Sequence, residues 1–363
     1  MLPPRWVRRV VLTPVIPVLT VLLLSALPLW AVAAAFASHW LPGRLRPLRL
    51  LWYLLVYLVI DTLMLLALTG LWVAAGCGRR LDRPRWQDAH YALMRHYLGV
   101  LVAAARLTFR LQITLDAEDA GLDAQRPDQE AAPHARPPLL VFSRHAGMGD
   151  SFLLVHLLLQ QGFRPRIVLR DTLQWAPTID IGLNRVPTYF VTRGAPRGTG
   201  TRAVAELAAG LGTGDALVIF PEGRNFTPNR RHASITTLEE RGEHNEAESA
   251  RELRHVLTPR SGGALAALDA AQDADVLFVA HTGLEDLSGV VDLWRGLPMD
   301  AGVQVRAWRV QRAQVPQVAG ARTAWLLWWW RQIDAWLLTH VGEQAIPDAA
   351  VDLVVGADED PPR

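Results

Sequence analysis

The stretch that decides the fold spans residues 138–151 and reads Pro138-Leu-Leu-Val-Phe-Ser-Arg-His145-Ala-Gly-Met-Gly-Asp150-Ser151. Its apolar run Leu139–Phe142 predicts a buried strand, and the apolar segment Ser151–Gln160 predicts a helix. The turn between them contains two glycines and is flanked by His145 and Asp150. Such strand-to-helix corners commonly carry the chemistry of α/β proteins, and an imidazole beside a carboxylate is a minimal general base. The alternative is a histidine that only caps or packs at a turn.

The composition narrows the class of protein. With 363 residues the chain has room for about two domains, and its formal charge of +2 gives no global basic field for nucleic acid. All of its positive charge is arginine, which fits codon bias and, secondarily, a use of arginine to bind phosphate. The single cysteine, Cys77, excludes an internal disulfide and a metal site built from cysteines.

Apolar residues are concentrated at the N-terminus. Val10–Ala37 and Leu50–Gly76 each exceed the roughly 20 residues needed to cross a bilayer, and three prolines interrupt the first segment. Arginines precede, separate and follow the pair, so the charge asymmetry that orients membrane helices is weak. Two arrangements remain: a hairpin that crosses twice with both ends cytoplasmic, or a kinked pair embedded in one leaflet. A cleaved signal peptide is disfavoured because the apolar core is too long. Asp61, within the second segment, is interpreted as a helix-pairing or neutral residue.

The middle of the chain alternates between strand-like and helix-like segments. A long amphipathic helix over 86–112 is expected to run into a strand at Thr108–Thr114. The further predicted strands are Leu139–Phe142, Arg166–Leu169, Thr188–Thr192, Ala216–Phe220, Val276–Ala280 and Val303–Arg309. The further predicted helices are Ser151–Gln160, Gly200–Gly210, Glu246–Val256 and Gly263–Ala270.

This alternation predicts an α/β fold with a mostly parallel mixed sheet flanked by helices, preceded by a pair of hydrophobic membrane helices. The expected organisation is a membrane-anchoring helical hairpin at 1–85, an α/β domain at 86–346 and a disordered tail at 347–363. Residues 115–137 are polar and are expected to form an insertion within that domain.

Two further predicted strands end in charged side chains, as the first does. Thr188–Thr192 leads into Arg193, and Ala216–Phe220 leads through a proline into Glu222, Gly223 and Arg224. In a parallel sheet these ends meet the end of Leu139–Phe142 at one edge. The set then combines a base, an orienting carboxylate and two planar cations suited to a phosphate. It lacks an evident enzyme nucleophile and enough ligands for a metal, which favours direct attack by a hydroxyl of the substrate.

The three stretches together resemble the membrane-bound glycerophospholipid acyltransferases of the 1-acylglycerol-3-phosphate acyltransferase type. That family carries a histidine, four residues and an aspartate, matched here by His145 through Asp150. Its second block matches the segment that ends in Arg193, and its Phe-Pro-Glu-Gly block matches Phe220–Gly223. The segment Leu257–Arg260 with the glycines that follow is similar to a motif of the lysocardiolipin acyltransferase branch.

Two departures from the family pattern concern the predicted site. The family usually has asparagine before the histidine, where this chain has Arg144. After Glu222-Gly223 the family has threonine and then arginine, where this chain has Arg224-Asn225. Either Arg224, or Arg230 and Arg231, would then take the place of the family's phosphate-binding arginine.

The resemblance implies a function. His145 would take the proton from the free hydroxyl of a lysophospholipid, most simply 1-acylglycerol-3-phosphate, as it attacks an acyl thioester, and Asp150 would hold the imidazole tautomer. The acceptor phosphate would be bound by Arg193 and by the loop that contains Glu222, Gly223 and Arg224. Within that loop Glu222 would shape the backbone rather than act as acid or base, and amides near Gly147 or Gly223 would stabilise the oxyanion. No cofactor or metal is expected, because acyl-CoA or acyl carrier protein serves as co-substrate.

The partners implied are a lysophospholipid, an acyl thioester donor and the lipid bilayer, with no nucleic acid. The resemblance implies a catalytic domain on the cytoplasmic face of the inner (plasma) membrane. The tryptophan-rich segment 324–338 is either a second contact with the membrane interface or a helix that packs on the sheet. The remaining alternatives are acyl transfer to another lysophospholipid, a non-catalytic lipid-binding module, and a hydrolase that uses His145 and Asp150.

Overall fold

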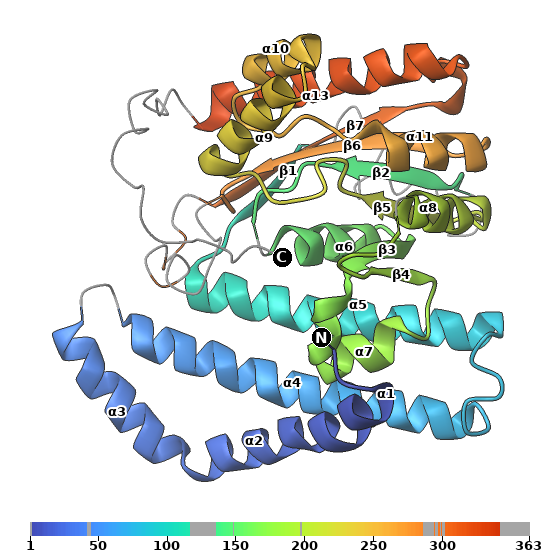
Figure 1. The fold of residues 1–363 in the computed structure, drawn as a ribbon. Coiled ribbons are helices and arrows are strands. Elements are labelled where there is room, and N and C mark those ends of the chain that lie inside the picture. Colours follow the sequence, from blue (N-terminus) through green and yellow to red (C-terminus); the bar gives the residue numbers. More distant parts are fainter. Residues whose placement is uncertain are drawn as a thin grey trace, which may run out of the picture.

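The computed structural model describes residues 2–41, 45–116, 136–147, 149–196, 198–285 and 302–341, together with Trp294, Leu297 and Met299. Its centre is a seven-stranded sheet in the order β1-β7-β6-β2-β5-β3-β4 (Figure 1). The strands are β1 (Ile113–Asp116), β2 (Leu139–Ser143), β3 (Arg164–Arg170), β4 (Thr188–Val191), β5 (Asp215–Ile219), β6 (Asp275–Thr282) and β7 (Val303–Val310). All neighbouring strands are parallel except β6 and β7, which pair antiparallel. The predicted α/β class with a mostly parallel mixed sheet is confirmed.

Helices cover both faces of this sheet (Figure 1). The N-terminal helices are α1 (Arg5–Val7), a π-helical turn η1 (Arg8–Leu12), α2 (Thr13–Ser25), α3 (Leu27–Trp40), α4 (Arg46–Ala74) and α5 (Pro84–Phe109). The later helices are α6 (Asp150–Gln160), α7 (Pro177–Leu183), α8 (Thr199–Ala209), α9 (Pro228–Glu240), α10 (His244–Glu252), α11 (Ser261–Ala270) and α13 (Ala319–Val341), with 3₁₀ turns η4 (Asp171–Trp175) and η5 (Arg312–Gln314).

Alternate residues of the central strands belong to two different cores. Leu140 and Phe142 of β2 pack with α8, α11 and α13, whereas Leu139 and Val141 pack with α6 on the other face. Every residue of β2 and β5 is buried, as expected for parallel strands that are covered on both sides. The strand ends at the carboxyl edge of the sheet are therefore held by packing on two faces.

The N-terminal helices lie against the α/β domain rather than extending away from it. The first apolar segment is interrupted at Ala26, just before Pro28, so that α2 and α3 form a kinked pair alongside α4. On its other side α4 packs along α5, where the Tyr97 hydroxyl donates a 2.9 Å hydrogen bond to Asp61 (Figure 1). Asp61 thus pairs two helices, as its interpretation from the sequence had it.

Arginines attach both ends of this helical layer to the α/β domain. Near the N-terminus, Arg8 and Arg9 form ion pairs of 2.7 and 3.1 Å with the fully buried Asp180 of α7. At the start of α4, Arg46 donates to the Leu297 carbonyl at 2.6 Å, and near its end the Leu68 carbonyl accepts from Arg185 at 2.6 Å. Helix α4 therefore contacts the domain near both of its ends.

Several element boundaries differ from the predictions. The strand predicted at Thr108–Thr114 begins later, because α5 continues to Phe109 and keeps Thr108 and Phe109 on its buried face. The helix predicted to extend to Val256 ends at Glu252, which leaves residues 253–260 without regular structure. Most of the predicted insertion at 115–137 and the whole tail at 347–363 lie outside the described residues.

The tryptophan-rich segment proves to be part of the core. In α13, Trp330 is fully buried and Trp329 stacks on Phe278 of β6, with ring centroids 4.5 Å apart. Helix α13 lies on the face of the sheet opposite to α2, α3 and α4 (Figure 1). The packing alternative for this segment is thereby supported, and Trp328 is the tryptophan of this helix that remains well exposed.

Candidate active site

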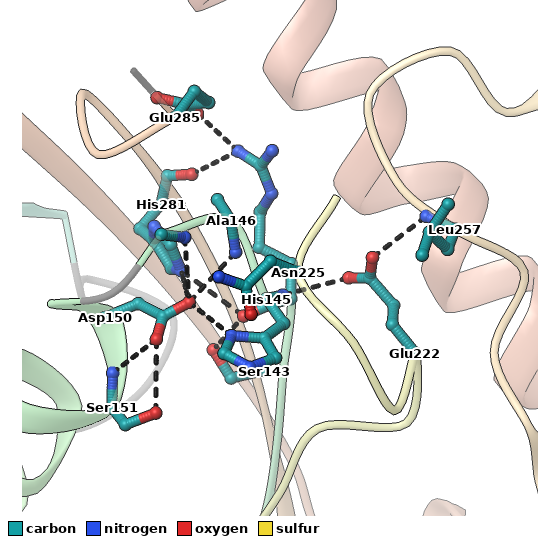
Figure 2. Close-up of polar contacts among 12 residues, drawn as sticks. Ser143, His145, Ala146, Asp150, Ser151, Glu222, Asn225, Leu257, His281 and Glu285 are labelled. Atoms are coloured by element: carbon teal, nitrogen blue, oxygen red, sulfur yellow. Dashed lines mark hydrogen bonds and ion pairs between the residues drawn. The ribbon is translucent and has the colours of Figure 1, made fainter. Parts of the chain in front are cut away.

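The predicted dyad forms at the carboxyl end of β2. The Nδ1 atom of His145 lies 2.7 Å from Oδ2 of Asp150, the first residue of α6 (Figure 2). The His145 side chain keeps 22% of its surface exposed, while that of Asp150 is completely buried. A carboxylate at Nδ1 fixes the tautomer in which Nε2 is the basic nitrogen, and Nε2 has no hydrogen-bond partner among the described residues.

The Asp150 carboxylate is held by its own turn and helix. Oδ2 accepts from the backbone amides of Ala146 at 2.9 Å and Gly147 at 3.3 Å, and Oδ1 accepts from the Ser151 amide at 2.5 Å and the Ser151 hydroxyl at 3.1 Å (Figure 2). Burial raises the pKa of Asp150, but the hydrogen bond and charge of His145, with the Ala146 amide, outweigh it and leave the pKa below its ordinary value. Asp150 therefore stays ionised and orients the imidazole.

The loop after β5 wraps around His145. Glu222 Oε1 accepts from the His145 amide at 3.0 Å, and the His145 carbonyl accepts from the Phe226 amide at 2.6 Å. The imidazole also packs against the Phe220 ring, with centroids 4.5 Å apart. The other carboxylate oxygen of Glu222 accepts from the Leu257 amide at 2.9 Å (Figure 2). Glu222 thus joins three segments of the site, as a residue that shapes the loop should.

Glu222 is poorly placed to exchange protons with a substrate. Only 2% of its surface is exposed, and both of its oxygens are occupied by backbone donors. Burial raises its pKa to about 8, against the effect of the two amides and of Arg144. Its role is to position the backbone of His145.

We therefore expect Glu222→Gln to destabilise the loop. A glutamine has a single carbonyl oxygen, so one of the two buried amides would face an NH₂ group and lose its acceptor. The cost should be about 1–3 kcal/mol of unfolding free energy, measured by denaturant titration, with a roughly tenfold lower rate of acyl transfer. The matched control is Glu206→Gln, which alters an exposed ion pair with Arg202 on α8. Equal stability of the two variants would contradict this role.

Arg144, the first departure from the family pattern, is buried and structural. Only 1% of its surface is exposed, and its guanidinium donates to the His281 carbonyl at 2.6 Å and to the His255 carbonyl at 3.0 Å. It also forms an ion pair of 2.6 Å with Glu285. The side chain cannot bind a substrate in this arrangement.

The predicted phosphate-binding arginines share one edge of the sheet but lie at different distances from the dyad. Arg224 follows β5, the neighbour of β2, and is exposed with no polar partner among the described residues. Arg193 is also exposed, but it follows β4, which β5 and β3 separate from β2 by roughly 14 Å at ordinary strand spacing. The sequence did not reveal this separation, because strand order depends on crossover connections.

The cation alternatives near the loop also differ in their contacts. Arg231 donates to the carbonyls of Leu253 and Arg251, at 2.5 and 2.8 Å, and is therefore committed to the fold. Arg260 donates its amide to the Pro221 carbonyl at 2.9 Å, and its side chain lies over Gly223, whose φ of +72° suits glycine. Arg260 is exposed, has no side-chain partner in the described part of the chain, and was not among the predicted site residues.

Two predicted oxyanion donors are already engaged. The Gly147 amide faces Asp150, and the Gly223 amide donates to the Phe220 carbonyl at 3.0 Å. The described residues also contain no cluster of three or more histidine, cysteine or acidic side chains arranged to hold a metal.

Sequence reasoning missed two residues behind the dyad. His281 is the penultimate residue of β6, and its Nε2 lies 3.8 Å from Asp150 Oδ2, while Glu285 follows in the next turn (Figure 2). The signal was present, because His281 directly follows the predicted strand Val276–Ala280, as His145 follows its own strand closely.

Comparison with known proteins supports acyl-transfer chemistry at the site around His145 and Asp150. Residues 125–281 match the family model described as Acyltransferase, and this segment contains the dyad, the Glu222 loop and His281. No curated protein and no solved structure matches the chain. The segment from β2 to β6 is thus similar to an acyltransferase domain, which supports acyl transfer in general without specifying the acceptor or the donor.

Proposed function

We propose that the protein transfers a fatty acyl group from an acyl thioester to the free hydroxyl of a lysophospholipid, with 1-acylglycerol-3-phosphate as the preferred acceptor and phosphatidic acid as the product. The observation that carries this proposal is the dyad, in which Nδ1 of a partly exposed histidine binds a buried, ionised aspartate and leaves Nε2 accessible. The donor is acyl-CoA or acyl carrier protein, and no other cofactor takes part.

The geometry assigns a role to each member of the dyad. Nε2 of His145 takes the proton from the acceptor hydroxyl as its oxygen attacks the thioester carbonyl, and Asp150 stabilises the imidazolium that forms. When the tetrahedral intermediate collapses, the C–S bond breaks and the imidazolium returns the proton to the departing thiolate. The ester oxygen of the product is then the acceptor's own, and the enzyme carries no acyl group at any stage.

The acceptor phosphate is proposed to bind the cations beside this dyad. Arg224 follows Gly223 on the loop that wraps His145, and the side chain of Arg260, from the segment before α11, lies over Gly223. The guanidinium groups of both residues are free to form bidentate contacts. Arg193 would reach the acceptor from the margin of the sheet. Three cations at one edge favour an anionic lysophospholipid over a neutral acceptor.

We propose that the N-terminal helices lie in one leaflet of the membrane. Two of them have the length and composition to cross a bilayer, namely Arg5–Ser25 and Arg46–Ala74. However, both ends of α4 contact the α/β domain through Arg46 and Arg185, which leaves no part of that helix to cross. The outward surface is apolar and carries Trp6, Trp30, Phe36 and Trp40, each about half exposed or more. The domain would then rest on the cytoplasmic face of the inner membrane.

The connector between α3 and α4 distinguishes the two membrane arrangements. In the one-leaflet arrangement Leu45 lies on the same side as the exposed Cys77, whereas a hairpin that crosses twice places it on the opposite side. We expect Leu45→Cys, in a Cys77→Ser background, to react with an impermeant maleimide in inside-out vesicles and not in right-side-out vesicles. The unaltered chain, labelled at Cys77, is the control, and the reverse pattern for Leu45→Cys would establish two crossings.

The function itself is tested by incubating purified protein with labelled acyl-CoA or acyl carrier protein and a panel of lysophospholipids. We expect the label in a diacyl lipid, fastest with 1-acylglycerol-3-phosphate. Preference for another head group would select a different acceptor, and label in free fatty acid would indicate a hydrolase. Lipid binding without turnover would indicate a non-catalytic module.

A further inference from the structure

The buried cation beside the dyad is the least expected feature of the site. Arg144 precedes His145 directly, and its guanidinium contacts three segments that are far apart in sequence: the end of β6 at His281, the turn at Glu285 and the irregular segment at His255. A long, charged side chain is rarely buried to 1% exposure unless it is paired, and here both terminal guanidinium nitrogens have partners while Nε has none among the described residues. The protein thus places a full positive charge immediately behind its catalytic turn.

The segment His281–Glu285 packs behind the catalytic turn, which is the turn from His145 to Asp150, and forms its back wall. A Cβ atom added to Gly147 would collide with the Leu284 carbonyl oxygen, so the turn and the wall are in direct contact. Nε2 of His281 lies 3.3 Å from the Arg144 carbonyl and 3.8 Å from Asp150 Oδ2. Any movement of the wall therefore changes the space that Ala146, Gly147 and Asp150 occupy.

Arg144 fixes this wall at two points. It binds the His281 carbonyl and the Glu285 carboxylate with one nitrogen, and the other oxygen of Glu285 accepts from the Gly283 amide at 2.6 Å. The charge of Arg144 also acts on His281, because burial and then that charge lower the pKa of His281 to about 4. His281 is consequently neutral at physiological pH, and its Nε2 donates to the Arg144 carbonyl rather than to Asp150.

We propose that Arg144 is a positioning residue for the dyad, because its guanidinium holds the back wall His281–Glu285 against the catalytic turn and places a positive charge next to His281, the neighbour of Asp150. This role rests on the proposed function, since it concerns the same dyad. The charged or titratable groups around His145 are Asp150 of α6, Arg144 directly after β2, Glu222 and Arg224 after β5, Arg260 before α11, His281 of β6 and Glu285 in the turn after it.

The opposite charges of Arg144 and Glu285 provide a test of the positioning role. Arg144→Met removes the positive charge and should favour protonation of His145, whereas Glu285→Gln removes the opposing charge with little change of shape and should disfavour it. The readout is the pH at which His145 reacts half-maximally with diethyl pyrocarbonate, followed by peptide mass spectrometry on the full chain. We expect shifts of at least about half a pH unit, upward for Arg144→Met and downward for Glu285→Gln.

The same variants should change kcat for acyl transfer more than KM. Loss of dyad geometry in Arg144→Met should lower kcat between about tenfold and a hundredfold. Arg144→Lys keeps the charge and loses the forked contacts, so it should retain the normal pH midpoint with a reduced kcat. The matched control is Arg166→Met, because Arg166 binds carbonyls and Asp215 in the same manner but near the start of β3.

The possible results of these experiments distinguish a positioning role of Arg144 from the proposed acyltransferase activity. If Arg144→Met and Glu285→Gln lower activity without opposite pH shifts, Arg144 is merely structural and the inference is overturned. If Arg144→Met does not fold, an unchanged pH midpoint in Glu285→Gln overturns it equally. If the unaltered protein shows no acyl transfer, the proposed function fails, while the pyrocarbonate reaction still decides whether Arg144 positions the dyad.

Discussion

Replacing His145 by alanine should abolish acyl transfer while leaving the fold intact. The side chain is partly exposed, and its polar contact is the one with Asp150, so its loss creates no large buried cavity. The loss of a general base at the reacting hydroxyl should lower kcat/KM by about three to four orders of magnitude. Initial rates with acyl-CoA and 1-acylglycerol-3-phosphate measure the effect, and circular dichroism checks the fold.

The matched control for this change is His96→Ala, which removes an exposed histidine on α5. We expect its rate to equal that of the unaltered protein. Full turnover by His145→Ala would exclude the dyad from the reaction, whatever the control does.

Asp150→Asn should have the second largest effect. An asparagine at this position presents an NH₂ group or a neutral oxygen where Asp150 accepts from Nδ1 of His145, so the imidazole tautomer is no longer fixed. It also weakens the acceptor for the amides of Ala146 and Ser151. We expect kcat to fall by about three orders of magnitude or more, with a smaller change in KM.

Asp215→Asn controls for the loss of a buried aspartate. Asp215 is also buried and binds Arg164 and Arg166, but it lies at the start of β5, at the opposite edge of the sheet. This variant should lose stability and keep its kcat. A similar fall in kcat for both variants would show that Asp150 acts through stability alone.

The sequence predicted those parts of the site that depend on local spacing. The four residues between His145 and Asp150 place these two at opposite ends of one turn, and the strand pattern around them predicts the sheet and its common carboxyl edge. The loop role of Glu222 was also anticipated and agrees with its contacts. These features follow from short segments whose conformation is set by nearby residues.

The features of the site that the sequence did not predict depend on contacts between residues far apart in the chain. Arg144 and Glu285 are 141 positions apart, and the anchor for Glu222 comes from Leu257, directly after the helix predicted over Glu246–Val256. That segment ends its helix early because Asp334 of α13 binds the amides of Arg254 and His255 instead. The hydrophobic pattern of residues 246–256 does not indicate that Asp334 binds this segment. Tertiary contacts therefore override the local helical preference here.

The position of Arg193 likewise depends on a property that the local sequence does not set, namely the order of the strands in the sheet. Three charged strand ends were expected to converge, and they do share one edge, but β5 and β3 lie between Arg193 and the dyad. Hydrophobic patterns identify strands and do not order them. The loop neighbours of His145, Arg224 and Arg260, are therefore better placed for the acceptor phosphate than the sequence suggested.

The central claim is that His145 activates a hydroxyl of the acceptor and that the enzyme itself carries no acyl group. The most direct measurement incubates a stoichiometric amount of the protein with labelled acyl thioester, first without and then with 1-acylglycerol-3-phosphate, and follows free thiol, lipid and intact protein mass. We predict no thiol release without the acceptor, and after its addition one labelled ester per thiol released. An acylated protein, or free fatty acid formed without the acceptor, would contradict the account.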